Sequence, residues 1–132
     1  MTSLQQQLQQ YFSEYSFQFD LPLAEKTYFK IGGPAEAYIE LSDRNKISAL
    51  VKWCSENHVK VTLFGGASNI IVADQGITGV VIHIAHDAVS FQENGHVVVG
   101  AGAKMALFVR KTIDAGYTGL EYFLGVPGTV GG

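Results

Sequence analysis

Cysteines, clusters of basic residues and long apolar runs are all scarce in this sequence of 132 residues. The single cysteine, Cys54, rules out an intrachain disulfide and the small secreted proteins that disulfides hold together. The formal net charge of −3 and the lack of Lys and Arg clusters argue against nucleic-acid binding. No apolar run approaches the roughly 18 residues of a membrane-spanning helix, and the glutamine-rich N-terminus has no signal-peptide pattern. We therefore expect a cytoplasmic protein that binds neither nucleic acids nor membranes.

Side chains suited to metal binding or nucleophilic catalysis are sparse too. The sequence has four histidines, His58, His83, His86 and His96. None of them has the spacing of a helical metal motif, and one cysteine cannot form a zinc-binding pair, so we expect no metal site. Glu121 has the chemistry of an acid beside a glycine-rich segment, but a hydrogen-bonded or solvated glutamate is commoner there. We assign no catalytic residue in this chain.

Glycine is what the sequence has in abundance. Of its 15 glycines, 14 gather at 32–33, 65–66, 76–79, 100–102, 116–119 and 125–132. Such clusters mark tight loops, because glycine tolerates positive φ and lets the backbone approach another group closely. The hydrophobic fraction of 47% excludes a disordered chain and predicts a folded core between these loops.

The first half of the chain shows helical spacing and strand-like alternation in turn. We predict an amphipathic helix over 3–17, a linker over 17–22, an extended piece ending in a turn over 27–34, a strand over 35–41, a helix capped by Ser42 or Asp43 and ending near Asn57, and a buried strand over 59–64. The strand–helix–strand order resembles a βαβ unit. We divide the chain into an N-terminal helix, 1–19, and a domain over 20–132.

The second half is predicted to continue the sheet and then turn to a helix. The expected elements are strand-like 70–72, a turn over 74–76, strands over 80–84 and 89–91, a tight hairpin turn at Asn94-Gly95, a strand over 97–99 and a helix over 103–115 that Gly116 ends. In that last helix Ala106, Val109, Arg110 and Ile113 form one helical spacing series.

The loop at 65–69, directly after a predicted strand, is the strongest physical signal. Backbone N–H groups at Gly65 and Gly66 can point into one concavity and bind an anion, and Ser68 and Asn69 add side-chain donors. The loop lacks the Gly-Lys-Ser/Thr ending of a P-loop and the Gly-x-Gly-x-x-Gly pattern of a Rossmann fold. The residues alone leave open a plain turn in which Ser68 and Asn69 bond the local backbone.

The glycine-rich segment 125–132 is the second candidate. Pro127 stiffens it at one point, while the glycines leave backbone free of side chains, so a flat ring could lie directly on it. A purely structural loop remains the alternative. Because a natural domain rarely ends within such a segment, we expect the natural protein to continue beyond Gly132.

Three segments, in this order and at this approximate spacing, resemble those of the UDP-N-acetylenolpyruvoylglucosamine reductases, bacterial flavoenzymes of peptidoglycan synthesis. They are TYFKIGGPA at 27–35, FGGASNIIV at 64–72, and Gly119-Leu120-Glu121 together with GVPGTVGG at 125–132. The resemblance covers nearly the whole chain from about residue 20. Each segment alone is a weak signal, whereas the three in order are specific.

The resemblance implies an α+β FAD-binding domain of the vanillyl-alcohol-oxidase (PCMH) type, with two small α/β subdomains and an incomplete C-terminus. It implies that the first loop holds the FAD diphosphate and that the last segment lines the flavin and the ribityl chain. The first set is Gly65, Gly66, Ala67, Ser68, Asn69 and Ile70, and the second is Pro127, Gly128, Thr129, Gly131 and Gly132. Relatives with covalent flavin carry a histidine near Asn69, so we expect non-covalent FAD. Ala67 stands where the family usually has glycine.

The activity that the resemblance implies is a two-step reduction. NADPH reduces FAD, and the flavin passes hydride to the enolpyruvyl double bond of UDP-N-acetylglucosamine enolpyruvate, giving UDP-N-acetylmuramate. The family's catalytic serine, glutamate and arginine lie beyond the matched segments, so we expect this chain alone to be inactive. Two alternatives stay open: the FAD-binding domain of another PCMH-type flavin oxidase or dehydrogenase, and a non-enzymatic nucleotide-binding module.

Overall fold

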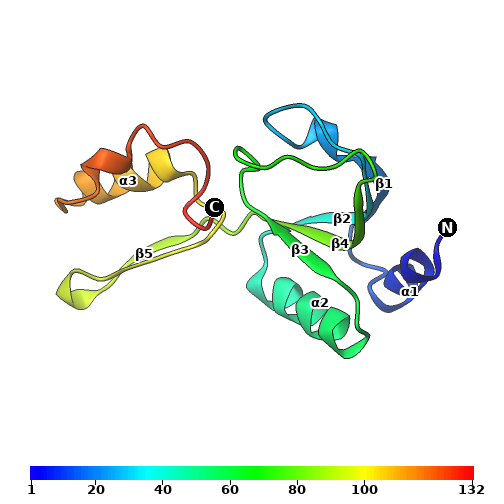
Figure 1. Ribbon diagram of the computed structural model, residues 1–132. Helices are drawn as coiled ribbons and strands as arrows, with labels where there is room; N and C mark the ends of the chain where they lie inside the picture. The colour runs from blue at the N-terminus through cyan, green and yellow to red at the C-terminus, as the bar shows by residue number, and fades with distance from the viewer.

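The computed structural model describes residues 1–132 and has two lobes (Figure 1). The first, here called the sheet lobe, comprises residues 1–84 and contains a four-stranded sheet with two helices. The second, here called the hairpin lobe, comprises residues 85–132 and contains a two-stranded sheet and one helix. The fold is α+β, as the sequence predicts. None of the helices has the length and apolarity that a membrane crossing requires.

The sheet of the first lobe is mixed. Its strands are β1 Gln18–Pro22, β2 Pro34–Leu41, β4 Ile77–Ile84 and β3 Val61–Phe64, in that spatial order. Strands β2, β4 and β3 are parallel, and β1 runs antiparallel to β2. The predicted strand–helix–strand unit therefore forms, but β4 lies between its two strands and pairs with both.

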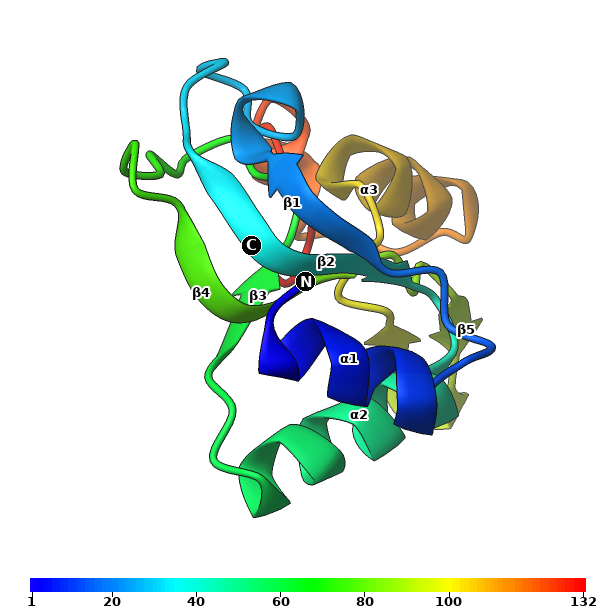
Figure 2. The ribbon, with the colours of Figure 1, turned by 90° about the vertical axis from the view of Figure 1, so that its right-hand side faces the viewer.

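Two helices, α1 Ser3–Tyr11 and α2 Arg44–Glu56, cover one face of this sheet (Figure 2). The core between helices and sheet is formed by Leu8, Ala37, Ile39, Leu41, Leu50, Cys54, Val80 and Ile82. Cys54 has no exposed surface and packs as a small side chain of this core. Nearly continuous apolar residues in β2 and β4 suit strands that are buried on both faces.

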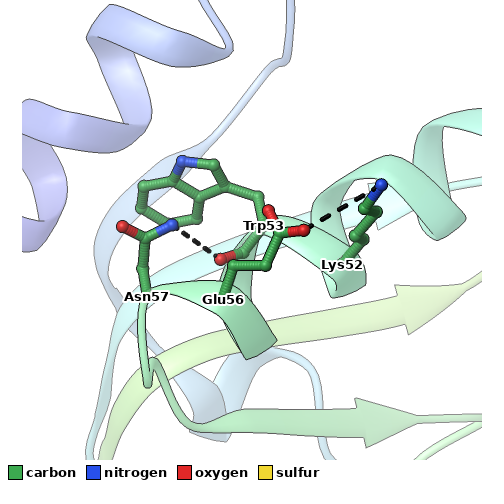
Figure 3. Close-up of polar contacts among 4 residues, drawn as sticks. All are labelled: Lys52, Trp53, Glu56 and Asn57. Atoms are coloured by element: carbon green, nitrogen blue, oxygen red, sulfur yellow. Dashed lines mark hydrogen bonds and ion pairs between the residues drawn. The ribbon is translucent and has the colours of Figure 1, made fainter.

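Local signals set both ends of α2. The Asp43 carboxylate accepts hydrogen bonds from the backbone N–H groups of Asn45 and Lys46, at 2.8 and 3.3 Å, so Asp43 and not Ser42 is the N-cap. At the other end, the Asn57 side-chain amide donates to the carbonyl of Trp53 at 2.9 Å (Figure 3). The helix therefore ends where the sequence predicts.

The opposite face of the sheet carries a second core cluster, formed by Leu23, Ala35, Tyr38, Phe64, Ala67, Val72 and Val81. Two of these residues, Ala67 and Val72, belong to the long connection between β3 and β4. Their burial holds that connection against the sheet. The glycine loop at 65–69 is thus part of the packed structure of the lobe.

The hairpin lobe begins with β5 Val89–Phe91 and β6 Val97–Val99, which pair only with each other. Between them Asn94 and Gly95 both have positive φ, at 67° and 78°, as predicted for an Asn-Gly turn. Helix α3 Met105–Asp114 follows and ends before Gly116, whose φ is +83°. Short 3-10 turns lie at Leu23–Glu25, Glu93–Gly95 and Glu121–Phe123.

Several predicted elements are wrong in kind. Residues 18–22 form strand β1 instead of a linker, because pairing with β2 outweighs the weak pattern of two half-buried apolar residues. Residues 70–72 form no strand: Val72 enters the second core cluster while Ile71 is 74% exposed. Residues 27–30 form turns and are not extended, with Lys30 at a φ of 58°.

Other predictions are wrong about the length of an element, the sheet that a strand joins or the face of a helix that is buried. Helix α1 ends at Tyr11, six residues earlier than predicted, and β5 belongs to a separate sheet instead of continuing the large one. In α3 the buried residues are Phe108, Val109 and Thr112. Ile113 of the predicted series is 41% exposed, because the helix packs on a face rotated by one residue. The division of the chain after residue 19 stays a prediction.

Candidate functional site

A cavity of about 750 Å³ lies where the two lobes meet. Both glycine-rich segments line it, so the structure brings together residues that are about 60 positions apart in the chain. Its lining consists of Leu63, Phe64, Gly65, Gly66, Ala67, Ser68, Asn69, Ile70, Ile84, Ala101, Met105, Phe123, Val126, Pro127, Gly128, Thr129, Val130, Gly131 and Gly132. Every residue predicted for the two loops is in this set. No lining residue is charged, and none is a histidine or a cysteine.

The first loop presents a row of free backbone donors. The N–H groups of residues 65–69 donate to no acceptor in the protein, and the side chains of Ser68 and Asn69 make no hydrogen bond. The plain-turn alternative requires local bonds from those two side chains, and the structure has none. Consecutive N–H groups without an acceptor, at the wall of a cavity, are the donors that an anion-binding concavity requires.

The left-handed residue of this loop is not one of its glycines. The left-handed residue is Ala67, with a φ of 51°, whereas neither Gly65 nor Gly66 has positive φ. A non-glycine residue in this region costs about 1–2 kcal/mol, which gives a physical reason for a glycine preference at this position. The loop keeps this shape because Ala67 is buried and its carbonyl accepts a hydrogen bond from the Tyr28 N–H at 3.1 Å.

Gly65 and Gly66 serve a close approach between the two loops. A Cβ on Gly65 would lie 2.6 Å from Thr129 Oγ1, and a Cβ on Gly66 would lie 3.3 Å from the Cα of Gly128. In the opposite direction, a Cβ on Gly128 would lie 2.9 Å from Ser68 Oγ. The two lobes are therefore in close contact at the glycines of both loops, and side chains at these positions would push the loops apart.

The second loop is fixed by the start of α3 and the chain before it. The Met105 N–H donates to the Gly128 carbonyl at 3.0 Å, and the Val130 N–H donates to the Ala103 carbonyl at 2.9 Å. The Gly131 N–H donates to the Ala101 carbonyl, also at 2.9 Å. These bonds make the segment a defined wall of the cavity, although it has no helix or strand of its own.

The apolar part of the cavity lining was not predicted from the sequence. Phe64 ends β3, Met105 starts α3, Phe123 precedes the second loop, and Val126 lies within that loop. The positions of Phe64 directly before the first glycines and of Val126 within the second glycine-rich segment are the signals that could have identified two of them. Glu121 lies outside the lining, and its carboxylate accepts a hydrogen bond from the Gly119 N–H at 2.8 Å, which confirms the hydrogen-bonded alternative.

Burial raises the pKa of two core groups of the sheet lobe, one on each face of the sheet. Burial, with a smaller effect of Glu40, raises the pKa of the Tyr38 hydroxyl to about 12. Tyr38 packs in the second core cluster with Ala67, and its hydroxyl lies 3.1 Å from His83 Nδ1. Burial also raises the pKa of the Cys54 thiol to about 11. The Cys54 thiol is therefore a core group on the far side of the sheet, without the lowered pKa of a reactive thiol.

Residues 34–132, three quarters of the chain, match the family model described as "FAD binding domain". This chain therefore belongs to the FAD-binding domain family. Within it, the chain is similar to UDP-N-acetylenolpyruvoylglucosamine reductases. It is 40% identical over 115 residues to the reductase of Rubrobacter xylanophilus, which covers 86% of this chain and 39% of that protein.

Solved structures agree with the match. The crystal structure of UDP-N-acetylenolpyruvylglucosamine reductase from Thermus caldophilus superposes with a TM-score of 0.70 at 28% identity, over 89% of this chain and 40% of that one. CrmK, a flavoenzyme of caerulomycin biosynthesis, superposes with a TM-score of 0.55 at 18% identity, over 70% of this chain and 19% of that one, and shows the fold alone. This chain spans about two fifths of the length of the reductases it matches.

Proposed function

We propose that the cavity binds FAD and that this chain forms the N-terminal, FAD-binding part of a UDP-N-acetylenolpyruvoylglucosamine reductase. The observation that carries the proposal is the row of free N–H groups at 65–69, in the wall of a cavity shared with a second glycine-rich loop. Membership of the FAD-binding domain family and the similarity to the reductases support it. Neither alternative function has an observation of its own in its favour.

The FAD diphosphate is assigned to the first loop. Backbone N–H groups are suited to this task because they bring positive partial charge without a long side chain. No carboxylate lines the cavity, so a diphosphate would meet no charge of its own sign there. Ser68 and Asn69 add a hydroxyl and an amide at the same place, and Ile70 closes that end of the lining.

The flavin end is assigned to the apolar part of the lining and to the second loop. Phe64, Met105, Phe123 and Val126 offer apolar surface for a planar ring, and the backbone at 127–132 lies beside them. The lining has no histidine or cysteine to bond a flavin covalently, which supports non-covalent FAD. The residues present therefore fit this cofactor.

In the proposed reaction, bound FAD supplies hydride transfer from NADPH to the enolpyruvyl double bond of the UDP-sugar. The residues of this chain bind and orient the cofactor and, through their apolar side chains, exclude water from it. We assign none of them to proton transfer, because no ionisable side chain lines the cavity. The UDP-sugar and NADPH as partners, and a cytoplasmic location, belong to the same proposal.

The proposal is tested by titrating the purified protein with FAD and following flavin fluorescence and absorption. We expect saturable but weak binding, and release of intact FAD on denaturation. The variant S68A/N69A, which removes two side-chain donors but leaves the backbone ones, should weaken binding by about tenfold. A protein that leaves FAD fluorescence and absorption unchanged at millimolar FAD would refute the proposed site, and a nanomolar affinity would refute the expectation of weak binding.

A further inference from the structure

Thr129 Oγ1 is the one buried side-chain nitrogen or oxygen atom in the protein without a hydrogen-bond partner. The other buried threonine hydroxyls are paired: Thr27 donates to the Ile31 carbonyl at 2.9 Å, and Thr112 donates to the Val109 carbonyl at 2.7 Å. A buried polar atom without a partner is costly and uncommon in folded proteins. The hydroxyl of Thr129 therefore calls for an explanation that packing does not supply.

The side chain of Thr129 lies between the two glycine loops. Its hydroxyl is 2.6 Å from the place where a Cβ on Gly65 would lie, and its methyl group is 3.6 Å from the corresponding place on Gly66. The backbone on both sides is held, because the Gly128 carbonyl and the Val130 N–H are bonded to the chain around α3. The two χ1 positions now filled by the hydroxyl and the methyl group both face the first loop. The hydroxyl has almost no accessible surface here, so its contact with a ligand requires a rotation about χ1 or a small separation of the two loops.

We infer that the Thr129 hydroxyl donates a hydrogen bond to the diphosphate of the bound dinucleotide, beside the N–H groups of residues 65–69. This inference rests on the proposed function. It assigns Thr129 to the diphosphate, whereas the family resemblance assigns its segment to the flavin and the ribityl chain. A single side chain of the hairpin lobe then contacts the same ligand group that the sheet lobe holds, which joins the lobes through the ligand.

The variant T129V tests this, because valine keeps the shape of threonine and removes only the hydroxyl. Without FAD, we expect the thermal midpoint of T129V to stay equal or rise, since an unpaired buried hydroxyl is replaced by an apolar group. In binding titrations, we expect the affinity for FAD to fall about 10- to 100-fold, as for loss of a hydrogen bond to a charged group. ADP, which has the diphosphate and no flavin, should lose affinity by the same factor. The variant T129S, which keeps the hydroxyl, should retain most of the FAD affinity.

The matched control is T112V in the same lobe, where the hydroxyl has a protein partner. We expect T112V to lower the thermal midpoint without FAD and to leave the FAD affinity unchanged. If the native protein binds FAD and T129V binds it equally well, the inference is wrong while the proposed function stands. A loss of affinity that affects riboflavin as much as FAD also overturns it, because riboflavin has no diphosphate. If the native protein binds no FAD, both the proposed function and the inference fail.

Discussion

At the scale of single residues, the glycines of the candidate site have two different physical roles. Gly128 has a φ of +101°, which L-residues rarely adopt, whereas Gly65 and Gly66 are needed for the space that they leave to the opposite loop. The sequence shows only that glycine is present. The positive φ at Ala67 was not predictable from residue type, because alanine gives no signal for a left-handed conformation.

The close approach at Gly65 predicts a specific steric effect. In G65A the new methyl group would lie 2.6 Å from Thr129 Oγ1, so the loops must separate, and we expect the free energy of unfolding to fall by about 1–3 kcal/mol. Adding T129A removes that oxygen and should restore most of the loss. Urea unfolding measures both effects. The control is G125A, where a Cβ would meet nothing within 4 Å; if G125A is as destabilising as G65A, the clash is not the cause.

Two buried titratable groups, the Cys54 thiol and the Tyr38 hydroxyl, predict how the stability of the protein changes at alkaline pH. The pKa of Cys54 is raised from 9.0 to about 11, and that of Tyr38 from 10.0 to about 12, so the folded state favours their neutral forms. This contribution to stability is full below the unfolded pKa values and is lost as pH rises through the folded ones. We expect the free energy of unfolding to fall by up to about 1.4 kcal/mol per pH unit, between about pH 9 and 11 because of Cys54 and between about pH 10 and 12 because of Tyr38.

The measurement is urea unfolding between pH 7 and pH 11, on the native protein and on C54A. The absolute stability of C54A will be lower because a core side chain is shortened. Its stability should nevertheless fall less steeply with pH between 9 and 11, because one titrating group has been removed. Equal slopes for the two proteins would show that the Cys54 thiol does not titrate in this way.

At the scale of secondary-structure elements, local signals were predictable and long-range pairing was not. The start of α2 at Asp43, its end near Asn57 and the Asn94-Gly95 turn all depend on residues within a few positions of each other. Strand β1 and the position of β4 between β2 and β3 depend on partners far away in the sequence. Both candidate loops were recognised because their glycines are a local signal, whereas the apolar lining of the cavity was not.

The cap of α2 gives a prediction at this scale. In D43A the N–H groups of Asn45 and Lys46 lose their acceptor, and we expect the free energy of unfolding to fall by about 1 kcal/mol. The control is S42A, because the Ser42 side chain makes no hydrogen bond and its removal should change stability by less than about 0.5 kcal/mol. Thermal or urea unfolding distinguishes them. A larger loss in S42A than in D43A would contradict the assignment of the cap.

At the scale of the whole molecule, the two lobes differ in how they are stabilised. Both core clusters lie in the sheet lobe, and the hairpin lobe has no comparable cluster of its own. Figure 1 shows the hairpin of β5 and β6 extending away from the sheet lobe, on the same side as α3. Regions with few buried apolar contacts open locally at lower free energy than a packed core. The hairpin lobe is therefore expected to be the less stable half.

Hydrogen exchange tests this difference and its link to the cofactor. Without FAD, amides of β5 and β6 should exchange faster than those of β2 and β4, and amides at 65–69 should exchange fast because they have no acceptor. Saturating FAD should slow exchange at 65–69 and in the hairpin lobe, since a ligand bound to both lobes stabilises the closed arrangement. Slowing confined to the sheet lobe would show that the ligand does not join the two lobes.

The row of backbone donors at 65–69 also has a consequence for inhibitor design. A substitution changes a side chain, but only proline removes a backbone N–H group, and proline would also have to fit the φ of each position in the loop. A compound that accepts hydrogen bonds from these groups would thus address atoms that point mutation can hardly delete. Resistance would then have to arise by reshaping the loop itself, at the expense of the cofactor that the same atoms are proposed to hold.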